Sequence, residues 1–368
     1  MNIAIIYGGK SSEHEVSLQS ASSIIRTIDK KHKLHLIGIS KNGAWYLHGD
    51  EERERIIKNE KAVLKIKKDE AKRVTVIPGG GTKKALKAGD EFLPTDAVFA
   101  VLHGRFGEDG TIQGLFEMAD IPYVGGDVMS TSISMDKEKT KMIWDYSGLP
   151  IVPYIAIKRQ DWDDPEKKKA LLARAEKDLE YPLFIKPCRA GSSVGAGMVK
   201  NRNELLEQAE ESFLWDNKIL VEACIEAREV ECSVTGNTKT VAYIPGEIIP
   251  THKFYDYEAK YTDPNGAELK IPADLNETQR KTIRETAIKA YEALDLSGLS
   301  RVDFFIDKRN GKIYLNEVNT IPGFTSISMF PKMCGASGLP YNELIMHLIE
   351  LAIDRFKADR KLKTCRQS

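Results

Sequence analysis

The chain has 368 residues, of which 42% are hydrophobic and 29% are charged, a balance typical of a globular protein with two or three domains. Lysine plus arginine and aspartate plus glutamate each number 54, so the formal net charge is zero. This balance excludes an electrostatic case for nucleic acid or an anionic membrane as a partner, and we expect neither.

The first third of the chain has the pattern of an open α/β sheet. Apolar runs predict strands at residues 2–7, 33–40, 73–78 and 96–104. The first run follows no basic segment and ends in two glycines, so we interpret it as a strand and not as a signal peptide. Residues 50–72 are rich in lysine and glutamate and are expected to form a solvated connection. The order of strand, glycine turn and helix predicts an α/β domain over residues 1–128.

The middle of the chain is interpreted as a second domain over residues 129–221. Helices are expected at residues 137–149, 163–178 and within 198–213, and strands at 181–187 and 219–225. The segment CRAGSSVGAG, residues 188–197, is a Gly/Ser-rich turn directly after a predicted strand.

The last third, residues 222–368, is interpreted as a third domain. Strands are expected at residues 229–236, 240–250, 299–307 and 312–320, and helices at 278–296 and 343–356. Arg309-Asn310-Gly311 suits a hairpin turn between the last two strands. Residues 252–268 are polar, rich in tyrosine and without periodicity, and are long enough to form a loop over a site.

The cysteines and the apolar runs indicate the compartment. The five cysteines are scattered, odd in number and without a CxxC pair, so neither zinc nor a disulfide framework is predicted. No run approaches the roughly 18 apolar residues of a membrane span. These features predict reduced thiols in a cytoplasmic protein.

Three oxygen-bearing residues on the predicted hairpin form a candidate metal site. Glu317 and Asn319 are two apart on one strand and therefore face the same way, and Asp303 lies on the opposing strand. Such hard donors suit magnesium, with nucleotide phosphates completing the coordination. Arg301 shares the face of Asp303 and could bind a phosphate or a developing oxyanion. The alternative interpretation is an exposed polar face of a hairpin.

The Gly/Ser-rich turn is a candidate phosphate loop. Lys186 ends the strand before it, and the turn contains Gly191, Ser192, Ser193 and Gly195. Small residues let backbone N–H groups approach a phosphate, and the lysine adds a positive charge. The GKS/T order of a Walker loop is absent. The alternative is an ordinary glycine turn beside an exposed lysine.

Further candidates lie at strand ends and helix starts, where α/β proteins build sites. His103 ends an apolar strand among glycines, Lys137 opens a helix, and Glu13 follows the first strand. Glu222 and Glu229 flank a strand break and could hold an adenine and a ribose. The alternatives are a structural histidine, a solvated lysine and surface glutamates, with Glu13 serving as an acidic residue of a first helical turn.

Taken together, these motifs resemble those of D-alanine–D-alanine ligases of the ATP-grasp superfamily. In chain order they are GGKSSEHEVS, LHGRFGEDGTIQG, SMDKEKTK, IKPCRAGSSVG, YDYEAKY, SRVDFF and NEVNTIPGFTSIS. Each motif alone is weak, but the ordered set over about residues 1–355 is specific. The resemblance implies a three-domain α/β (α+β) ATP-grasp fold. It also implies that ATP and two D-alanines give ADP, phosphate and D-alanyl-D-alanine, a peptidoglycan precursor.

The resemblance implies which residues bind the substrates. Glu13 is expected at the ammonium group of the first D-alanine and His103 near its carboxylate. The carboxylate of the second D-alanine is expected at Ser328 and Met329. The residues expected to contact ATP are Lys137, Lys186, Ser193, Glu222, Ile225, Glu229 and Lys260.

The resemblance also implies the catalytic groups. The ligands expected for two Mg²⁺ (or Mn²⁺) ions are Asp303, Glu317 and Asn319. Arg301 and the backbone of Gly323 are expected to stabilise a tetrahedral oxyanion. Phosphorylation turns the first carboxylate into an acyl phosphate, which the second amine attacks. Glu13, Ser192 and Tyr261 are expected to form a hydrogen-bonded set near that amine. An ordinary tyrosine pKa of about 10 is high for a general base, so the identity of the base stays open.

Closure and assembly are implied in the same way. An acyl phosphate must be kept from water, and residues 252–268 are the expected lid, with tyrosines and lysines that suit closure over phosphates. The family is commonly dimeric, which implies a homodimer.

Three competing interpretations remain. A D-alanine–D-lactate ligase shares the family motifs, but the YDYEAKY loop looks like the type that uses D-alanine. A non-catalytic ATP-binding protein would lack metal or phosphate ligands, and the ligands are present here. Another ATP-grasp ligase, such as a carboxylase, is disfavoured because the N-terminal and tyrosine-loop motifs also match.

Overall fold

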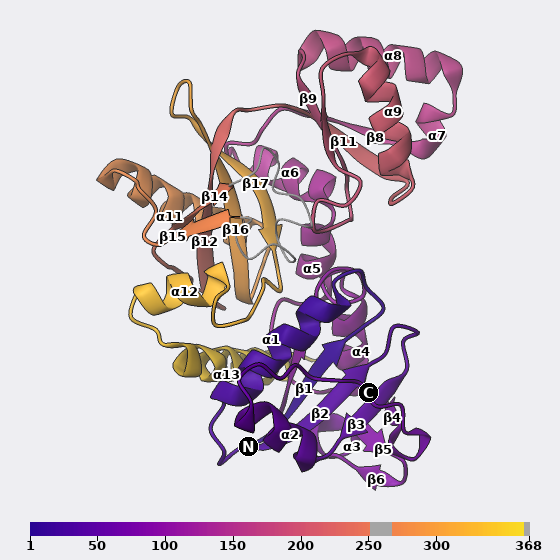
Figure 1. The fold of residues 1–368 in the computed structure, drawn as a ribbon, viewed down its shortest axis with the longest axis vertical. Helices are drawn as coiled ribbons and strands as arrows, with labels where there is room; N and C mark the ends of the chain where they lie inside the picture. Colours follow the sequence, from indigo (N-terminus) through magenta and orange to yellow (C-terminus); the bar gives the residue numbers. More distant parts are fainter. Residues whose placement is uncertain (251–266, 364–368) are drawn as a thin grey trace.

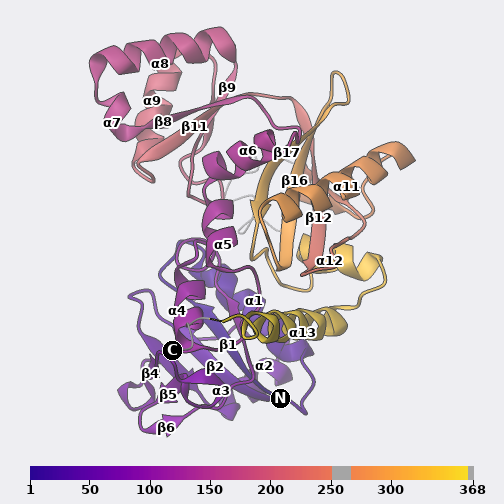
Figure 2. The ribbon, with the colours of Figure 1, turned by 180° about the vertical axis from the view of Figure 1, so that it is seen from behind.

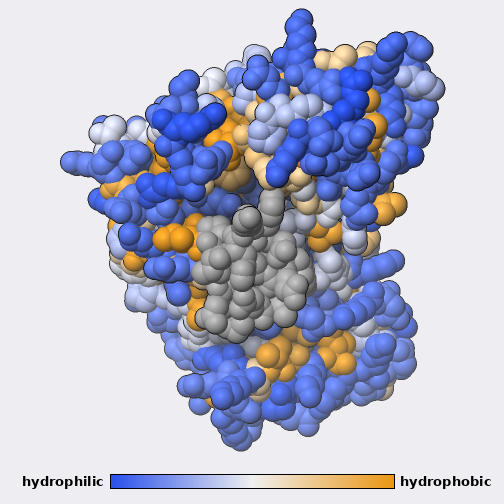
Figure 3. Space-filling model, turned by 45° about the horizontal axis from the view of Figure 1, so that its top comes forward, coloured by the Kyte–Doolittle hydropathy of each residue, from blue (hydrophilic) through white to orange (hydrophobic). Residues whose placement is uncertain are grey.

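The computed structural model describes residues 1–250 and 267–363. Along the long axis, the N-terminal sheet lies at one end, a sheet from the last third of the chain lies near the middle, and a smaller sheet lies at the other end (Figure 1). Among the described residues, no helix is long and apolar enough to cross a membrane. The face in Figure 3 is mainly hydrophilic, with apolar residues in small separate patches.

The N-terminal sheet has the strand order β3-β2-β1-β7. Its strands are β1 (Asn2–Gly8), β2 (Lys33–Ile39), β3 (Trp45–His48) and β7 (Ala97–Val101). β1 is parallel to β2 and β7, and β3 is antiparallel to β2. On β1, Ile3 packs with helix α1 (His14–Thr27), whereas Ala4 packs with helix α4 (Thr111–Ala119). Because helices cover both faces, the strands read as continuous apolar runs.

The connection after β3 is more structured than the sequence analysis expects. Residues 50–72 begin with helix α2 (Asp50–Lys58), in which Ile56 and Glu52 are buried. Ile56 joins the same core as α1, so the expectation of a wholly solvated connection is wrong. The elements that follow are the 3-10 helix η1 (Glu70–Lys72), β4 (Val74–Val76), α3 (Gly81–Lys84), β5 (Leu86–Ala88) and β6 (Glu91–Phe92). Strands β4, β5 and β6 form a small antiparallel sheet.

Two helices lead from the N-terminal sheet toward the rest of the molecule (Figure 2). They are α5 (Val128–Met135) and α6 (Lys137–Tyr146), and the side chain of Asp136 between them caps the first turn of α6. On α6, the buried Trp144 donates a hydrogen bond to the Ala290 carbonyl at 3.0 Å. Helix α6 is therefore anchored to the core of the C-terminal sheet.

The central sheet is antiparallel and has a core of its own. In spatial order its strands are β10 (Gly197–Val199), β9 (Leu183–Pro187), β11 (Lys218–Ala223) and β8 (Tyr154–Lys158). The helices packed on it are α7 (Arg159–Trp162), α8 (Pro165–Asp178) and α9 (Arg202–Phe213). β11 continues two residues past the expected boundary at 221/222, since Glu222 still pairs with β8 and β9. The division of the chain at 128/129 and 221/222 stays a prediction.

The C-terminal sheet has the order β15-β14-β12-β16-β17, with β13 paired to β12. Its strands are β12 (Ala227–Gly236), β13 (Val241–Ala242), β14 (Gly246–Pro250), β15 (Ala267–Lys270), β16 (Gly298–Asp307) and β17 (Ile313–Asn319). Its helices are α11 (Glu277–Ala293), α12 (Met329–Ala336) and α13 (Tyr341–Asp359). β16 and β17 form the expected hairpin around Arg309-Asn310-Gly311, so that prediction is confirmed.

The two ends of the chain share one hydrophobic core. The Phe324 ring lies 5.4 Å from Phe99 of β7, 5.8 Å from Phe330 of α12 and 5.5 Å from Tyr341 of α13, measured between ring centroids. Residues of β1, β7, α12 and α13 belong to this one cluster. The N-terminal sheet is thereby fixed to the C-terminal helices. The loop after β7 also contacts the segment that follows β17, since His103 Nδ1 lies 2.9 Å from the Ile321 carbonyl oxygen.

Candidate active site

The candidate metal residues lie together on the β16–β17 hairpin. Asp303 pairs with Glu317 and Arg301 pairs with Asn319, so all four side chains lie on one face. Asn319 donates from Nδ2 to Asp303 Oδ2 at 2.9 Å. Arg301 donates from Nε and Nη2 to the two Asp303 oxygens at 2.7 Å each.

Arg301 is a fixed positive charge on this face. Its Nε also lies 3.1 Å from Glu231 Oε2. Burial alone would lower the pKa of Arg301, but the Asp303 and Glu231 carboxylates outweigh it and hold that pKa well above its usual range. A guanidinium held in this way is suited to stabilising negative charge that develops beside it.

The donor set on the hairpin fits a cation whose coordination a nucleotide completes. Within residues 1–250 and 267–363, no group of three or more His, Cys, Asp or Glu side chains could hold a metal ion by itself. Asp303, Glu317 and Asn319 offer two carboxylates and one amide oxygen. Such a set suits a hard cation and leaves positions for phosphate oxygens and water.

Two predicted phosphate-binding lysines reach the hairpin from other elements. Lys137, at the start of α6, places its Nζ 3.5 Å from Glu317 Oε2. Lys186 of β9 places its Nζ 2.8 Å from Glu222 Oε2 and donates to Asn316 Oδ1 at 3.1 Å. The structure thus brings Lys137 of α6 to a carboxylate of the C-terminal hairpin and Lys186 of the central sheet to an amide on the same hairpin.

The turn after β9 has a backbone suited to binding phosphate. Ser192, Ser193 and Gly195 have positive φ angles of 52°, 58° and 67°. The left-handed region costs a non-glycine residue about 1–2 kcal/mol, and such strain gathers at ligand sites. Lys137 donates to the Ala190 carbonyl at 3.0 Å, so its amine is held at this turn.

Helix α9 and the residues just after it hold the turn from behind. Gln208 Nε2 and Ser212 Oγ donate to the Gly195 carbonyl at 3.1 and 2.6 Å. Trp215 packs so closely on Gly195 that an added Cβ would lie 2.5 Å from the indole ring. The shape of the turn is therefore set by contacts to α9 as well as by its own residues.

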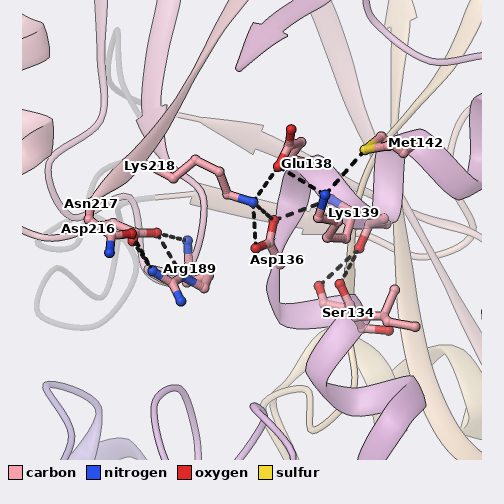
Figure 4. A network of polar contacts seen from close by, with 11 residues as sticks. Ser134, Asp136, Glu138, Lys139, Met142, Arg189, Asp216, Asn217 and Lys218 are labelled. Atoms are coloured by element: carbon pink, nitrogen blue, oxygen red, sulfur yellow. Dashed lines mark hydrogen bonds and ion pairs between the residues drawn. The ribbon is translucent and has the colours of Figure 1, made fainter. Parts of the chain in front are cut away.

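A charged network ties α6 to the same turn (Figure 4). Lys218, at the start of β11, donates to the two Asp136 oxygens at 2.8 and 2.7 Å and also contacts Glu138. Arg189 Nη2 lies 2.6 Å from Asp216 Oδ1, just before β11. Asp216 and Lys218, around the start of β11, thus contact both the Gly/Ser-rich turn and the first turn of α6. These contacts fix the separation of the two turns.

Glu13 meets the Gly/Ser-rich turn from the N-terminal sheet. Ser192 Oγ donates to Glu13 Oε1 at 2.6 Å, although the two residues are 179 apart in sequence. An added Cβ on Gly104 would lie 2.4 Å from Glu13 Oε2, so a glycine at this position leaves room for the carboxylate. Two of the three residues expected in the hydrogen-bonded set are therefore in direct contact.

His103 lies buried two residues after the end of β7. Its Nδ1 is 2.9 Å from the Ile321 carbonyl oxygen and its Nε2 is 3.0 Å from Ser20 Oγ. Burial lowers the pKa of His103, and the nearby Glu13 carboxylate opposes this only in part. We therefore describe the imidazole as neutral, with Nδ1–H donating to Ile321.

The expected second-substrate residues lie where the chain enters α12. Ser328 is the N-cap residue of this helix, and its Oγ accepts a hydrogen bond from the Thr325 N–H at 3.1 Å. An added Cβ on Gly323 would lie 3.2 Å from that Oγ. The Met329 side chain packs in the core, so its backbone N–H is the group left for a ligand.

The residues expected to bind the nucleoside lie near the end of β11, in the link that follows it and near the start of β12. Glu222 is buried at the end of β11, and Ile225 and Glu229 are half-buried. Lys260, Tyr261 and most of the expected lid, residues 252–268, lie outside the described residues.

Lys141 is a buried charged residue that the sequence analysis did not select. Its Nζ lies 3.0 Å from Glu222 Oε1, and its side chain has 0% exposure. The available signal was its spacing, since residues four apart share a helix face and Lys137 was already a candidate.

Glu108, which is half-buried, is another residue that the sequence analysis did not select. Burial raises its pKa well above the usual range, and the nearby Glu13 carboxylate adds to the effect. Its signal was its place in GRFGED, directly after the strand that ends at His103. Perturbed carboxyl groups of this kind gather at functional sites.

Comparisons with known proteins match the chain from end to end. Two family models match, described as D-ala D-ala ligase N-terminus over residues 2–126 and D-ala D-ala ligase C-terminus over residues 143–350. A D-alanine–D-alanine ligase of Treponema denticola is 98% identical over 368 residues, which cover 100% of both chains. One from Treponema pallidum is 44% identical over 364 residues, which cover 99% of this chain and 91% of that one.

Solved structures have the same fold. The D-alanine–D-alanine ligase from Coxiella burnetii has a TM-score of 0.83 and 36% identity, covering 98% of this chain and 96% of that chain. The VanG D-Ala:D-Ser ligase from Enterococcus faecalis has a TM-score of 0.82 and 37% identity, covering 95% of this chain and 99% of that chain.

Proposed function

The chain belongs to the D-alanine–D-alanine ligase family and uses ATP to join two D-alanines, and we propose that the site described above carries out this reaction. One observation supports the assignment. Lys137 and Lys186 converge on a hairpin that carries Asp303, Glu317 and Asn319, from elements on the other side of the site. This arrangement can receive a triphosphate between cations and metal-binding oxygens.

We propose that Asp303, Glu317 and Asn319 hold two Mg²⁺ (or Mn²⁺) ions. These ions would neutralise charge on the transferring phosphoryl group. Lys137, Lys186 and the turn containing Ser193 bind the phosphates in this proposal. The nucleoside lies along Glu222, Ile225 and Glu229, and Lys260 closes on the phosphates from the lid.

The proposed D-alanine sites lie on either side of the reacting carbon. Glu13 binds the ammonium of the first D-alanine, and the neutral His103 lies near its carboxylate. Arg301 and the Gly323 N–H receive the oxyanion that forms when the second amine attacks. Ser328 and the Met329 N–H bind the second carboxylate.

The amine of the second D-alanine must lose a proton before it attacks the acyl phosphate. We propose that Ser192, which donates to Glu13, belongs to the proton path, with Tyr261 as its third member. Glu108 lies near this set, since the Glu13 carboxylate helps to raise its pKa. We further propose three domains divided near residues 128 and 221, a homodimer, and a cytoplasmic location, which suits ATP-dependent chemistry and free cysteines.

The test is ADP release by the purified protein with ATP, Mg²⁺ and D-alanine. We expect ADP and D-alanyl-D-alanine in equal amounts. Parallel reactions offer D-serine or D-lactate as the second substrate, because a D-Ala:D-Ser ligase has the same fold. Incorporation of D-lactate with rejection of D-alanine at neutral pH would contradict the dipeptide assignment.

A further inference from the structure

One buried amine in the nucleotide region has no part in the proposed chemistry. Lys141 lies one helical turn after Lys137 on α6, so both side chains leave the same face of the helix. Lys137 reaches toward Glu317 on the hairpin, and Lys141 reaches Glu222 on β11 at 3.0 Å. A lysine with no exposed surface is costly, and its presence beside a predicted ligand residue calls for a cause.

The charges around Glu222 do not balance. Its Oε1 lies 3.0 Å from Lys141 Nζ, and its Oε2 lies 2.8 Å from Lys186 Nζ. The neighbouring Lys137 and Glu317 lie 3.5 Å apart, and with this pair included three ammonium groups meet two carboxylates, so one positive charge is left over among the described residues. Among the described residues, neither Lys141 Nζ nor Glu222 Oε1 makes a hydrogen bond of good geometry. The Tyr154 ring, with its centroid 5.8 Å from Lys141 Nζ, adds only weak stabilisation.

A buried excess of positive charge favours an anion. Burial lowers the pKa of Lys141 although Glu222 opposes the shift, so the charged form is held at a cost in the free protein. Lys186 is the member of the cluster that also faces the hairpin, through Asn316. The excess charge is therefore directed toward the expected phosphate position.

We propose that Lys141 is a positioning residue that shares the charge of Glu222 and so leaves Lys186 with a positive charge for a nucleotide phosphate. The inference rests on the proposed ATP site. If Lys141 carries no charge, the charges of Glu222 and Lys186 cancel each other. The pair then binds phosphate less well, although both of its residues remain.

The sign of the stability change separates this role from a structural one. Lys141→Met removes a buried charge and leaves Glu222 paired with Lys186. The free protein should then be as stable as before or more stable, because no carboxylate is left unpaired. A lysine that served only packing or pairing would give a less stable protein with unchanged nucleotide affinity.

The experiment compares Lys141→Met with Lys139→Met, the same change on an exposed side chain of the same helix. Calorimetry measures the Kd of Mg²⁺ with the non-hydrolysable analogue AMP-PNP, displacement measures that of adenosine, and melting gives Tm without ligand. We expect Lys141→Met to raise the AMP-PNP Kd about tenfold. We expect adenosine affinity to stay within about twofold and Tm not to fall.

Lys141→Gln serves if the methionine variant does not fold, since it also removes the charge and should give the same loss. An unchanged AMP-PNP Kd in a folded Lys141 variant overturns the inference while the proposed ATP site stands. A loss shared equally by adenosine, or by Lys139→Met, also overturns it. Failure of the unaltered protein to bind AMP-PNP overturns the proposed ATP site itself.

Discussion

The two carboxylates of the hairpin are held differently. Asp303 has both oxygens on the Arg301 guanidinium, whereas Glu317 meets Lys137 at the longer distance of 3.5 Å. A bidentate guanidinium pair is stronger than a single longer contact. The Asp303 carboxylate is therefore held by a two-point contact with a single guanidinium.

Removing Glu317 should stop turnover. We expect Glu317→Ala to lower kcat about a thousandfold or more, because phosphoryl transfer loses metal-held charge stabilisation. ADP release at saturating substrates measures the loss. Glu285→Ala, on the exposed side of α11, is the matched control and should keep full activity. Nearly intact activity in Glu317→Ala would show that the metal assignment is wrong.

At the scale of residues, sequence reasoning found groups whose chemistry is visible in short spacings. The two-residue spacing of Glu317 and Asn319 and the glycines around Ser192 are of this kind. It did not find Lys141 or Glu108, because a lysine or glutamate in a polar stretch reads as a surface residue. Only the fold shows that Lys141 is buried beside a carboxylate and that Glu108 lies close to Glu13.

The Gly/Ser-rich turn depends on the helix behind it. Gly195 has a positive φ and lies against Trp215, so an added methyl group meets both backbone strain and a rigid ring. Gly43, in the turn before β3, has a φ of +89° but nothing within 4 Å of an added Cβ. A comparison of alanine substitutions at Gly195 and Gly43 therefore separates the effect of backbone strain from the effect of moving the Gly/Ser-rich turn.

We expect Gly195→Ala to raise the KM for ATP about tenfold or more, because small displacements of phosphate-binding groups are costly. Gly43→Ala should lower the free energy of unfolding by about 1 kcal/mol and leave KM unchanged. Steady-state kinetics and denaturant unfolding measure the two effects. A KM change of equal size in both variants would contradict a specific role for the α9 contacts.

At the scale of elements, periodicity and turn chemistry predicted most strands and helices. The hairpin followed from Asn310-Gly311, and α11 followed from its amphipathic pattern and begins with a capping box at Asn276. Helix α2 was not predicted, because few of its residues are apolar and its burial rests mainly on Ile56 and on the Glu52–Arg55 pair. Composition alone does not show such pairing.

At the scale of the whole molecule, the two sides of the site have separate hydrophobic cores. The buried cluster of the central sheet spans Ile155 to Val221, whereas the hairpin packs in another cluster with Val302 and Leu315, and the core around Phe324 is distinct from both. Regions with separate cores can open separately. The central sheet should therefore move as a unit relative to the hairpin.

Native-state hydrogen exchange tests this division. Peptides from β1, β7 and α13 should share one free energy of opening, and peptides from β8, β9 and β11 should open at lower free energy. Mg²⁺ with AMP-PNP should raise protection of the central sheet, because the ligand binds across both sides of the site. Equal protection of all these peptides without ligand would contradict separate cores.

At this largest scale, the meeting of Glu13 and Ser192 was expected only through the family resemblance, because no local pattern of residues predicts it. Glu13 and Ser192 belong to different sheets, and their 2.6 Å contact depends on how those sheets pack. Packing of this kind is set by buried surfaces, such as those around Phe324, that no local pattern describes.

Phe324 also has a consequence for how the protein is made. Its N–H donates to Ser20 Oγ across 304 residues, and His103 meets Ile321 across 218. Because the chain is made from its N-terminus, these contacts cannot form until Phe324 has left the ribosome. A nascent or truncated chain therefore has no assembled active site. It cannot use ATP to form an activated D-alanine that water would then hydrolyse.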